Sequence, residues 1–316
     1  MANSTKRKRP QAFELVLPAT SANLGPAFDA AALALDLSLK LRARAAERFS
    51  IVARGRNADI CEKLENNLIL STYREILRAE GKPIESLALR IENQIPIGKG
   101  CGSSAAARLA GIALAVHFGQ LRWDDRRIVG EASRLEHHPD NAAACWMGGL
   151  AVARMSSETE AQVASIVPKG NWPLLVALSE EALSTEKARA VLPRKYNQAD
   201  AVANIQNAML LLVAFVQRRT DLLASALEDR IHQPYRALLC PLLPALQGLP
   251  KSVGVVGAVL SGAGPSVLMF VDPKANLGRV RAKVRDYLRA QNLSAELIAT
   301  RIRKMGATQR RDRKNG

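Results

Sequence analysis

The sequence of 316 residues contains few cysteines and few aromatic residues. The cysteines are widely separated and form no Cys-x-x-Cys pair, so neither a disulfide framework nor a zinc site is expected. Aromatic residues make up only 4% of the chain while alanine is abundant, which favours closely packed helices over an all-β sandwich. We interpret four residues as reduced thiols of a cytoplasmic protein: Cys61, Cys101, Cys145 and Cys240.

Long apolar runs are also missing. The longest strongly apolar run near the middle of the chain, residues 208–216, is too short to span a bilayer. The basic start followed by residues 13–28 imitates a signal peptide, but Pro18, Asn23 and Pro26 interrupt the apolar region. We therefore expect no membrane insertion and a cytoplasmic location.

Acidic residues are in deficit, because 45 lysines and arginines face 29 aspartates and glutamates, for a net charge of +16. Much of the excess lies in residues 6–9 and 301–316, so segments 1–12 and 305–316 are predicted to be basic, disordered tails. The remaining body is moderately basic, as suits an enzyme that handles polyanions. Weak, nonspecific contact of the tails with nucleic acid stays open, although no aromatic residue interleaves with them.

The two best-known glycine-rich phosphate motifs are absent. In the stretch IPIGKGCGSSAAA at 95–107, the Walker spacing fails because Lys99 is followed by Gly100. A Rossmann fingerprint that begins at Gly98 fails because Ser103 stands where its third glycine is needed. The stretch is therefore not one of the common nucleotide loops.

The same stretch nevertheless predicts an anion site. An alternating strand pattern at 87–92 precedes it, and an almost wholly apolar helix pattern at 103–118 follows it. A glycine-rich connection into a helix start collects free backbone N–H groups at the positive end of the helix dipole, most often for phosphate. An ordinary tight turn is the alternative, and the serine pair at 103–104 argues against it.

A boundary between two domains is predicted in the polar stretch 156–162, which divides the body into segments 13–160 and 161–304. In the first segment, a short strand leads into a turn-rich stretch, Pro18–Asp29, which is a candidate binding loop. The second segment contains a strand, turn and strand pattern around residues 253–270.

Three separated stretches together resemble the motifs of the GHMP kinases: PATSANLGPAFD at 18–29, PIGKGCGSSAA at 96–106 and LSGAGPS at 260–266. With HPDN at 138–141, the first stretch is most similar to the members that act on L-homoserine. The resemblance extends from about residue 13 to about residue 302. It implies an α+β fold with an N-terminal phosphate-loop domain and a ferredoxin-like C-terminal domain.

The resemblance also implies an activity. It is the phosphorylation of the side-chain hydroxyl of L-homoserine by ATP with Mg²⁺, a step toward threonine, in a protein that forms a homodimer. Matching positions imply nucleotide contacts at Asn67, Pro96, Gly98, Lys99, Gly100, Cys101, Gly102, Ser103 and Ser104. They also imply Mg²⁺ ligation by Ser104 and Glu136, with Glu131 as the alternative carboxylate. Asn67 stands before a helix and could equally be its cap.

The acceptor residues follow from the same resemblance. Arg189 and Arg236 match positions that clamp the substrate carboxylate, a task that suits the planar guanidinium fork. The matching candidates for the ammonium group and the pocket wall are Asn23, Asp29, Thr185 and His138. For catalysis, Asn141 and Arg189 would orient the hydroxyl, and Asp140 is a weaker candidate for a base.

Several positions depart from the family pattern. Lys99 stands in the place of a serine and would either lie near the phosphates or point to solvent. Cys101 replaces a leucine and is expected to pack. Ala27 replaces a glycine, which would strain the loop if its backbone needs a positive φ, and His137 replaces a glycine beside the proposed Mg²⁺ ligand.

Two other functions stay open. One is a GHMP kinase that acts on another small alcohol, and the other is a non-catalytic, basic nucleic-acid-binding protein on the same scaffold. The intact glycines of the loop, together with Ser104 and Glu136, argue against the second, because nucleic-acid binding would not require them together.

Overall fold

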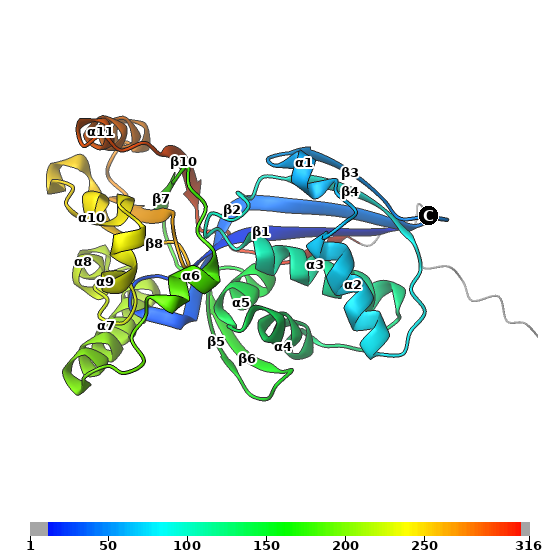
Figure 1. Ribbon diagram of the computed structural model, residues 1–316. Coiled ribbons are helices and arrows are strands. Elements are labelled where there is room, and N and C mark those ends of the chain that lie inside the picture. Colours follow the sequence, from blue (N-terminus) through cyan, green and yellow to red (C-terminus); the bar gives the residue numbers. More distant parts are fainter. Residues whose placement is uncertain (1–11, 311–316) are drawn as a thin grey trace, which may run out of the picture.

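A computed structural model describes residues 12–310 and shows two domains side by side (Figure 1). The first domain is built on a mixed sheet in the order β11-β1-β2-β4-β3, with β5 paired to β2 and β6 to β5. Its strands are β1 (Phe13–Asn23), β2 (Ala27–Ala45), β3 (Ser50–Gly55), β4 (Leu87–Asn93), β5 (Leu150–Met155), β6 (Ala161–Ile166) and β11 (Thr308–Arg310). Its helices are α1 (Ala58–Cys61), α2 (Leu68–Ala79), α3 (Ser103–Phe118), α4 (Asp125–Glu136) and α5 (Asp140–Met147).

The second domain is a four-stranded antiparallel sheet in the order β10-β7-β9-β8, with helices packed on it. Its strands are β7 (Pro173–Leu178), β8 (Val255–Leu260), β9 (Val267–Val271) and β10 (Glu296–Arg301). Its helices are α6 (Thr185–Ala190), α7 (Gln198–Gln217), α8 (Leu223–Ala226), α9 (Gln233–Arg236), α10 (Leu242–Gln247) and α11 (Leu277–Ala290), and short 3₁₀ turns cover Thr220–Leu222, Ala237–Leu239 and Lys251–Val253. This strand order and its β-α-β-β-α-β succession are ferredoxin-like, so the predicted α+β class is confirmed.

The predicted domain boundary at residue 160 needs correction. Residues 156–160 form the turn of the β5–β6 hairpin, and β6 pairs with β5 along its whole length, from Ala161 to Ile166. The chain therefore leaves the first sheet only after Ile166. The polar composition that suggested a linker belongs to an exposed hairpin turn, which needs the same residue types.

The chain also returns to the first domain at its end. Ile302 bridges Leu35 of β2, and β11 then pairs with β1 in the register Val16–Thr308. The prediction of a disordered tail at 305–316 is thus wrong for residues 305–310. Residues 1–11 and 311–316, where the rest of the predicted tails falls, lie outside the described residues.

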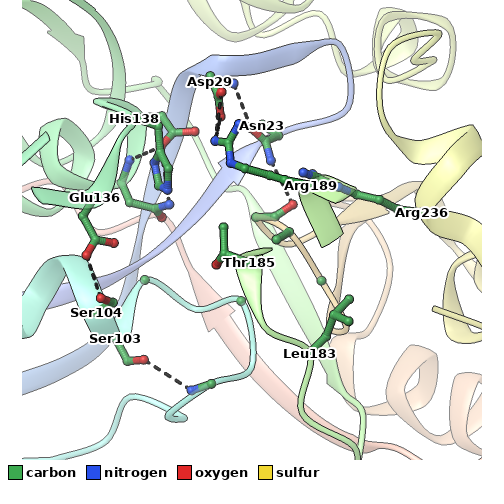
Figure 2. A pocket seen from close by; sticks show the side chains of 18 residues that line it. Asn23, Asp29, Ser103, Ser104, Glu136, His138, Leu183, Thr185, Arg189 and Arg236 are labelled. Atoms are coloured by element: carbon green, nitrogen blue, oxygen red, sulfur yellow. Dashed lines mark hydrogen bonds and ion pairs between the residues drawn. The ribbon is translucent and has the colours of Figure 1, made fainter. Parts of the chain in front are cut away.

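Helix α3 shows why the glycine-rich stretch sits where it does. The helix is strongly apolar in composition, and ten of its 16 residues are buried between the sheet and the neighbouring helices. Burial of this helix fixes its N-terminal end, and with it the glycine loop, at the junction of the two domains (Figures 1 and 2).

One helix in the described part of the chain, α7, is long and apolar enough to cross a membrane by length and composition alone. In the fold it packs on the second domain through the buried side chains Leu211, Ala214 and Phe215. The ring of Phe215 packs, in tilted arrangements, against the rings of Trp172 and Phe270 of that domain, so this face of α7 is part of a protein core.

Candidate active site

Three segments that are far apart in the sequence meet where the two domains join. They are the end of β1, the glycine loop before α3, and the β8–β9 turn. Hydrogen bonds link them pairwise: Thr20 N to Cys101 O (3.1 Å), Ser261 Oγ to Gly100 O (2.7 Å) and Asn23 Nδ2 to Gly262 O (2.8 Å). The loop is therefore held from both domains at once.

The glycine loop has the backbone of an anion cradle. Gly98, Gly100 and Gly102 all lie in the left-handed region, with φ of 70°, 73° and 69°. A Cβ at Gly102 would collide with the Thr20 hydroxyl, so glycine is required there for both conformation and space. Helix α3 begins at the next residue and directs its free N–H groups and dipole toward the cavity.

A hydroxyl and a carboxylate lie together beside this loop (Figure 2). Ser104 Oγ donates to Glu136 Oε1 at 2.6 Å, and Arg108 Nε donates to the same oxygen at 2.5 Å. Glu136 lines the cavity, whereas the alternative carboxylate, Glu131, pairs with Arg134 and does not line it. Ser104 and Glu136 thus supply hard oxygen ligands of the kind that Mg²⁺ prefers.

An apolar pocket of about 340 Å³ shares the start of α3 with this cavity. Residues Gly98, Ser103 and Ser104 line both, so the two spaces adjoin at the loop. Asn67 lines the apolar pocket and also caps α2, because its side chain accepts hydrogen bonds from the N–H groups of residues 69 and 70. Both expectations for Asn67 are thus compatible in one position.

The charged end of the cavity contains two arginines with different partners. Arg189 Nη2 binds both carboxylate oxygens of Asp29, at 2.8 and 2.9 Å. Arg236 is only 1% exposed and donates to the carbonyl of Ala188 at 3.0 Å. In the described residues no carboxylate lies within ion-pair distance of Arg236. Its Nη1 also contacts His232 Nδ1 at 3.1 Å, so the guanidinium is hydrogen-bonded within the chain but has no carboxylate at close range and could bind one from a ligand.

Burial and neighbouring charges shift the pKa values of three groups at this end of the cavity. Burial raises the pKa of Asp29, and Arg189 opposes the shift. Burial would lower the pKa of His138, but its hydrogen bond to Asp140 and the nearby carboxylates raise that pKa overall. Burial likewise lowers the pKa of the Arg236 guanidinium.

The start of α5 holds the residues predicted for catalysis. Asp140 is 1% exposed, and its Oδ1 contacts His138 Nδ1 at 2.7 Å and accepts from the backbone N–H of Asn141 at 2.6 Å. The Thr20 hydroxyl donates to Asn141 Oδ1 at 2.6 Å, which leaves the amide NH₂ of Asn141 as the group to donate into the cavity. Asp140 is thus engaged in holding its neighbours.

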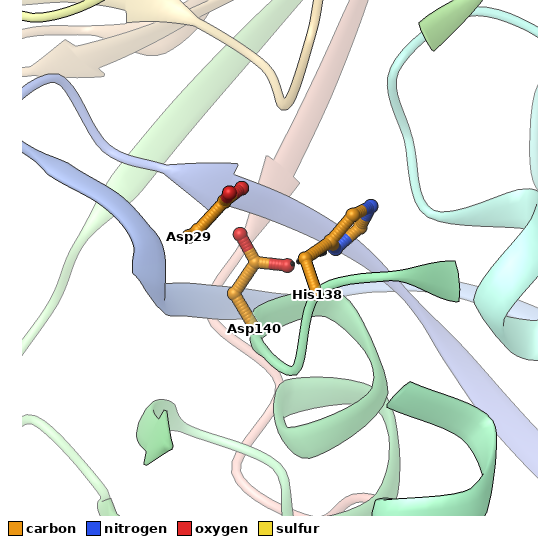
Figure 3. Close-up of side chains that lie close together, drawn as sticks. All are labelled: Asp29, His138 and Asp140. Carbon is orange, nitrogen blue, oxygen red and sulfur yellow. Dashed lines mark hydrogen bonds and ion pairs between the residues drawn. The ribbon is translucent and has the colours of Figure 1, made fainter. Parts of the chain in front are cut away.

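Asp29, His138 and Asp140 form a compact cluster (Figure 3). One ligand atom from each lies within 4.8 Å of the others, so the three could hold a cation. The contacts already present explain the proximity, since Arg189 binds Asp29 and Asp140 binds His138. His137 takes no part in the cluster.

Lys99 takes a position that neither sequence-based interpretation foresaw. Its Nζ donates to the carbonyl oxygens of Glu180 and Glu181, at 2.5 and 2.8 Å. These residues lie in the loop that leads to Thr185 at the start of α6, which lines the cavity. Lys99 therefore ties the glycine loop of the first domain to a cavity loop of the second.

The other departures from the family pattern have distinct outcomes. Cys101 is buried, and burial raises the pKa of its thiol to about 12. Pro96 is buried before the loop. Ala27 begins β2 without a positive φ, whereas His137 does have one, at 65°, directly after α4. The backbone at Ala27 therefore does not need a glycine, whereas the positive φ at His137 is one that a glycine would adopt more easily.

The structure adds residues that sequence reasoning did not assign. Thr20 orients Asn141, and Arg108 pairs with Glu136. The cavity is also lined by Leu183, Gly262, Ala263 and Gly264. Thr20 and residues 262–264 lie inside two of the motifs named above, so the sequence could have indicated them as site residues. Nothing in the sequence indicated Arg108.

The fold and the site together define a small-molecule phosphotransferase. A glycine loop at a helix start lies between an apolar pocket and a charged pocket, so a phosphate held at the loop would face both. This arrangement suits transfer from a nucleotide to a polar acceptor.

Comparison with known proteins specifies the family. Residues 67–149 match the GHMP kinases N terminal domain, and residues 211–290 match the GHMP kinases C terminal domain. A homoserine kinase of Solibacter usitatus is 42% identical over 82% of this chain and 85% of its own. A homoserine kinase of Deinococcus radiodurans is 34% identical over 90% of this chain and 93% of its own. The chain belongs to the GHMP kinase family.

Solved structures agree with this fold. A homoserine kinase of Cytophaga hutchinsonii superimposes with a TM-score of 0.79 at 21% identity, covering 98% of this chain and 100% of its own. A putative homoserine kinase of Listeria monocytogenes gives 0.74 at 27% identity, covering 95% and 100%.

Proposed function

We infer that the protein transfers the γ-phosphoryl group of ATP to the side-chain hydroxyl of L-homoserine, a step toward threonine. The single observation that carries the choice of acceptor is the charged pocket. It offers a buried arginine, Arg236, that lacks a carboxylate partner in the described residues. Next to it lies the Asp29–Arg189 ion pair, whose two side chains would bind the two charged groups of an acceptor. A zwitterionic acceptor supplies the missing carboxylate and an ammonium group together.

The nucleotide would lie across the glycine loop. Its triphosphate suits the N–H groups of residues 98–104, and its base suits the apolar pocket beside Asn67. Ser104 and Glu136 would hold Mg²⁺, which supplies neutralisation of the charge that develops on the phosphates. Such an enzyme acts on soluble metabolites, which fits a cytoplasmic location.

Charged side chains would bind the acceptor, and a hydrogen bond from the amide of Asn141 would orient it. Arg236 and Arg189 bind its carboxylate, Asp29 and Asn23 its ammonium group, and Thr185 and His138 complete the wall. Asn141, whose carbonyl oxygen is occupied by Thr20, donates to the reacting hydroxyl. Phosphoryl transfer depends mainly on positioning and charge stabilisation, so these contacts suffice without a protein base.

Release of ADP tests the function. The purified protein is incubated with ATP, Mg²⁺ and, in parallel, L-homoserine, mevalonate, galactose or threonine. We expect turnover with L-homoserine and a phosphomonoester product by ³¹P NMR. Turnover with a different alcohol alone would reassign the acceptor, and salt-sensitive RNA binding without any turnover would overturn the kinase function.

Single substitutions of Asn141 and Asp140, at the start of α5, separate the roles of the two side chains. Asn141→Ala is expected to lower kcat about 10²-fold, because the hydroxyl loses the donor that positions it. Asp140→Asn should cost less in kcat but should lower stability, because Asp140 holds His138 and the Asn141 backbone. Near-normal turnover of Asn141→Ala with a loss of several orders of magnitude in Asp140→Asn would make Asp140 the base.

Lowering the pH should weaken acceptor binding at a higher pH than an ordinary aspartate would cause. Asp29 binds an ammonium group only when ionised, and burial raises its pKa above the ordinary 3.8. As pH falls through this raised pKa, the KM for L-homoserine should rise, at a higher pH than an ordinary aspartate would cause. The control is 4-hydroxybutyrate, which lacks the ammonium group, so its KM should not follow the same titration.

Loss of the Lys99 tether should affect the acceptor more than the nucleotide. In Lys99→Met the loop before Thr185 loses two hydrogen bonds to a charged donor, so the KM for L-homoserine should rise roughly tenfold. Lys82→Met, at an exposed lysine outside the cavity, serves as the control. A rise confined to the KM for ATP would show instead that Lys99 serves the triphosphate.

A further inference from the structure

A fully buried histidine, His232, lies against the arginine at the charged end of the cavity. It stands directly before α9, and its carbonyl oxygen accepts a hydrogen bond from the backbone N–H of Arg236 at 3.0 Å. This single helical turn brings side chains four residues apart onto one face, so the ring of His232 meets the guanidinium of Arg236. Figure 2 shows Arg236 reaching the charged end of the cavity beside Arg189.

The two ring nitrogens of His232 have different partners. Nε2 lies 2.9 Å from the carbonyl oxygen of Gly25, in the turn between β1 and β2 of the first domain, and 3.4 Å from Asp229 Oδ2. Nδ1 lies 3.1 Å from Arg236 Nη1. A carbonyl oxygen can only accept a hydrogen bond, and a guanidinium can only donate one. The proton therefore belongs on Nε2, and Nδ1 offers its lone pair to Arg236.

The surroundings of His232 favour a neutral ring. An imidazolium would carry an N–H at Nδ1 as well and would point it at the guanidinium of Arg236, so two donors and two positive charges would meet. Burial lowers the pKa of His232 below its ordinary value, and Arg236 adds to this shift while Asp229 opposes it. Only the neutral ring can accept a hydrogen bond from the arginine.

Buried polar groups fix the turn that carries both side chains. Asp229 Oδ2 accepts hydrogen bonds from the backbone N–H groups of His232 at 3.0 Å and of Gln233 at 2.6 Å. Gln233 Oε1 accepts from the N–H of Leu260, at the end of β8, at 2.7 Å. With the bond to Gly25, the ring of His232 is thus held from the sheet of the second domain and from the first domain at once.

These contacts determine which donors of Arg236 remain for a ligand. A guanidinium has five N–H groups. In Arg236, Nε donates to the carbonyl of Ala188 at 3.0 Å and Nη1 donates to His232, which leaves three. The ring of Phe28 stacks on His232 with 5.1 Å between ring centroids, and Cζ of Arg236 lies 5.3 Å from its centroid. Two hydrogen bonds and an aromatic ring therefore fix the plane of the guanidinium, which lines the cavity.

We propose that His232, as a neutral ring with its proton on Nε2, is a positioning residue that orients the guanidinium of Arg236 toward the carboxylate of the acceptor. His232 does not itself line the cavity, so it acts through Arg236. The inference rests on the proposed function, because it requires an acceptor that has a carboxylate.

Two substitutions separate the roles of the ring nitrogens. In His232→Gln the amide nitrogen can replace Nε2 and donate to Gly25, but no acceptor remains at the place of Nδ1. In His232→Asn the amide oxygen can replace Nδ1 and accept from Arg236, but the donor to Gly25 is lost. Both side chains are smaller than histidine, so urea unfolding should show similar losses of stability.

Steady-state kinetics with L-homoserine then distinguishes orientation from packing. His232→Gln should raise the KM for L-homoserine about tenfold and change kcat less than about threefold, because a hydrogen bond to a charged group that binds the substrate is lost. His232→Asn should keep this KM within about threefold of the wild type. An equal rise in both variants, a rise in His232→Asn alone, or no rise in either would overturn the proposal.

An acceptor without a carboxylate provides the control. 3-Aminopropanol has a hydroxyl and an ammonium group, so its kcat/KM should be the same in the wild type and in His232→Gln. A loss equal to that for L-homoserine would show that His232 acts on the shape of the pocket and would overturn the proposal. Failure of the wild type to phosphorylate L-homoserine would instead refute the proposed function, before any variant is made.

Nitrogen-15 NMR of the wild type tests the tautomer without a variant and without an acceptor. At pH 7 the ring of His232, assigned through its nuclear Overhauser contacts with Phe28, should have a protonated Nε2 and an unprotonated Nδ1. A proton on Nδ1, in either a neutral or a charged ring, would overturn the proposal, because His232 could not then accept from Arg236.

Discussion

Replacement of Gly102 by alanine is expected to destabilise the protein by about 2–5 kcal/mol and to lower kcat/KM for ATP by at least about 100-fold. The residue has a φ of 69°, which costs a residue with a Cβ about 1–2 kcal/mol. The added Cβ would also collide with the hydroxyl of Thr20, which is fully buried and bonded to Asn141. Both the glycine loop and the proposed hydroxyl-orienting amide would have to move.

A second glycine separates the two contributions. Gly81 has a similar φ of 61°, but a Cβ there would meet nothing within 4 Å. Gly81→Ala should therefore show only the conformational cost, with normal kinetics. Urea unfolding of both variants measures the difference, and equal losses of stability would mean that the contact with Thr20 is unimportant.

Replacement of Arg236 by methionine is expected to lower kcat/KM for L-homoserine about 30- to 3,000-fold. Loss of one partner from a buried charge pair costs about 2–5 kcal/mol, and about 1.4 kcal/mol corresponds to a factor of ten. Arg236 is almost fully buried and has no carboxylate partner within the described chain, so this cost should fall on the complex with acceptor. The unliganded protein should lose little stability, because a buried charge is removed with the side chain.

The control for Arg236→Met is an acceptor without a carboxylate. 3-Aminopropanol keeps the hydroxyl and the ammonium group of L-homoserine but offers nothing to Arg236. Its kcat/KM should therefore be low with the wild type and nearly unchanged in the variant. A similar loss for both acceptors would indicate that Arg236 acts on the shape of the pocket and not on the carboxylate.

Local patterns predicted much of the fold. The alternation before residue 95 and the apolar run after residue 103 placed β4 and α3 correctly, because both elements bury side chains at a regular period. The resemblance to a family brought together residues that the cavity gathers, among them Asn23, Glu136 and Arg189. Their individual roles stay predictions.

Contacts between residues that are far apart in the sequence could not be predicted from it. Nothing near Lys99 indicates that its ammonium group meets the carbonyls of residues 180 and 181, because such bonds depend on how the two domains dock. The polar turn before β6 looked like a linker because exposed hairpins and linkers share a composition. Residues 308–310 looked like tail because a three-residue edge strand has no period of its own.

The return of the chain to the first sheet bears on synthesis. Strand β1 is synthesised long before its edge partner β11, since Val16 pairs with Thr308. A nascent chain therefore exposes one edge of β1, which could pair with other chains, until β11 has been made. The second domain, whose strands all lie between residues 173 and 301, can complete its own sheet before the first domain does.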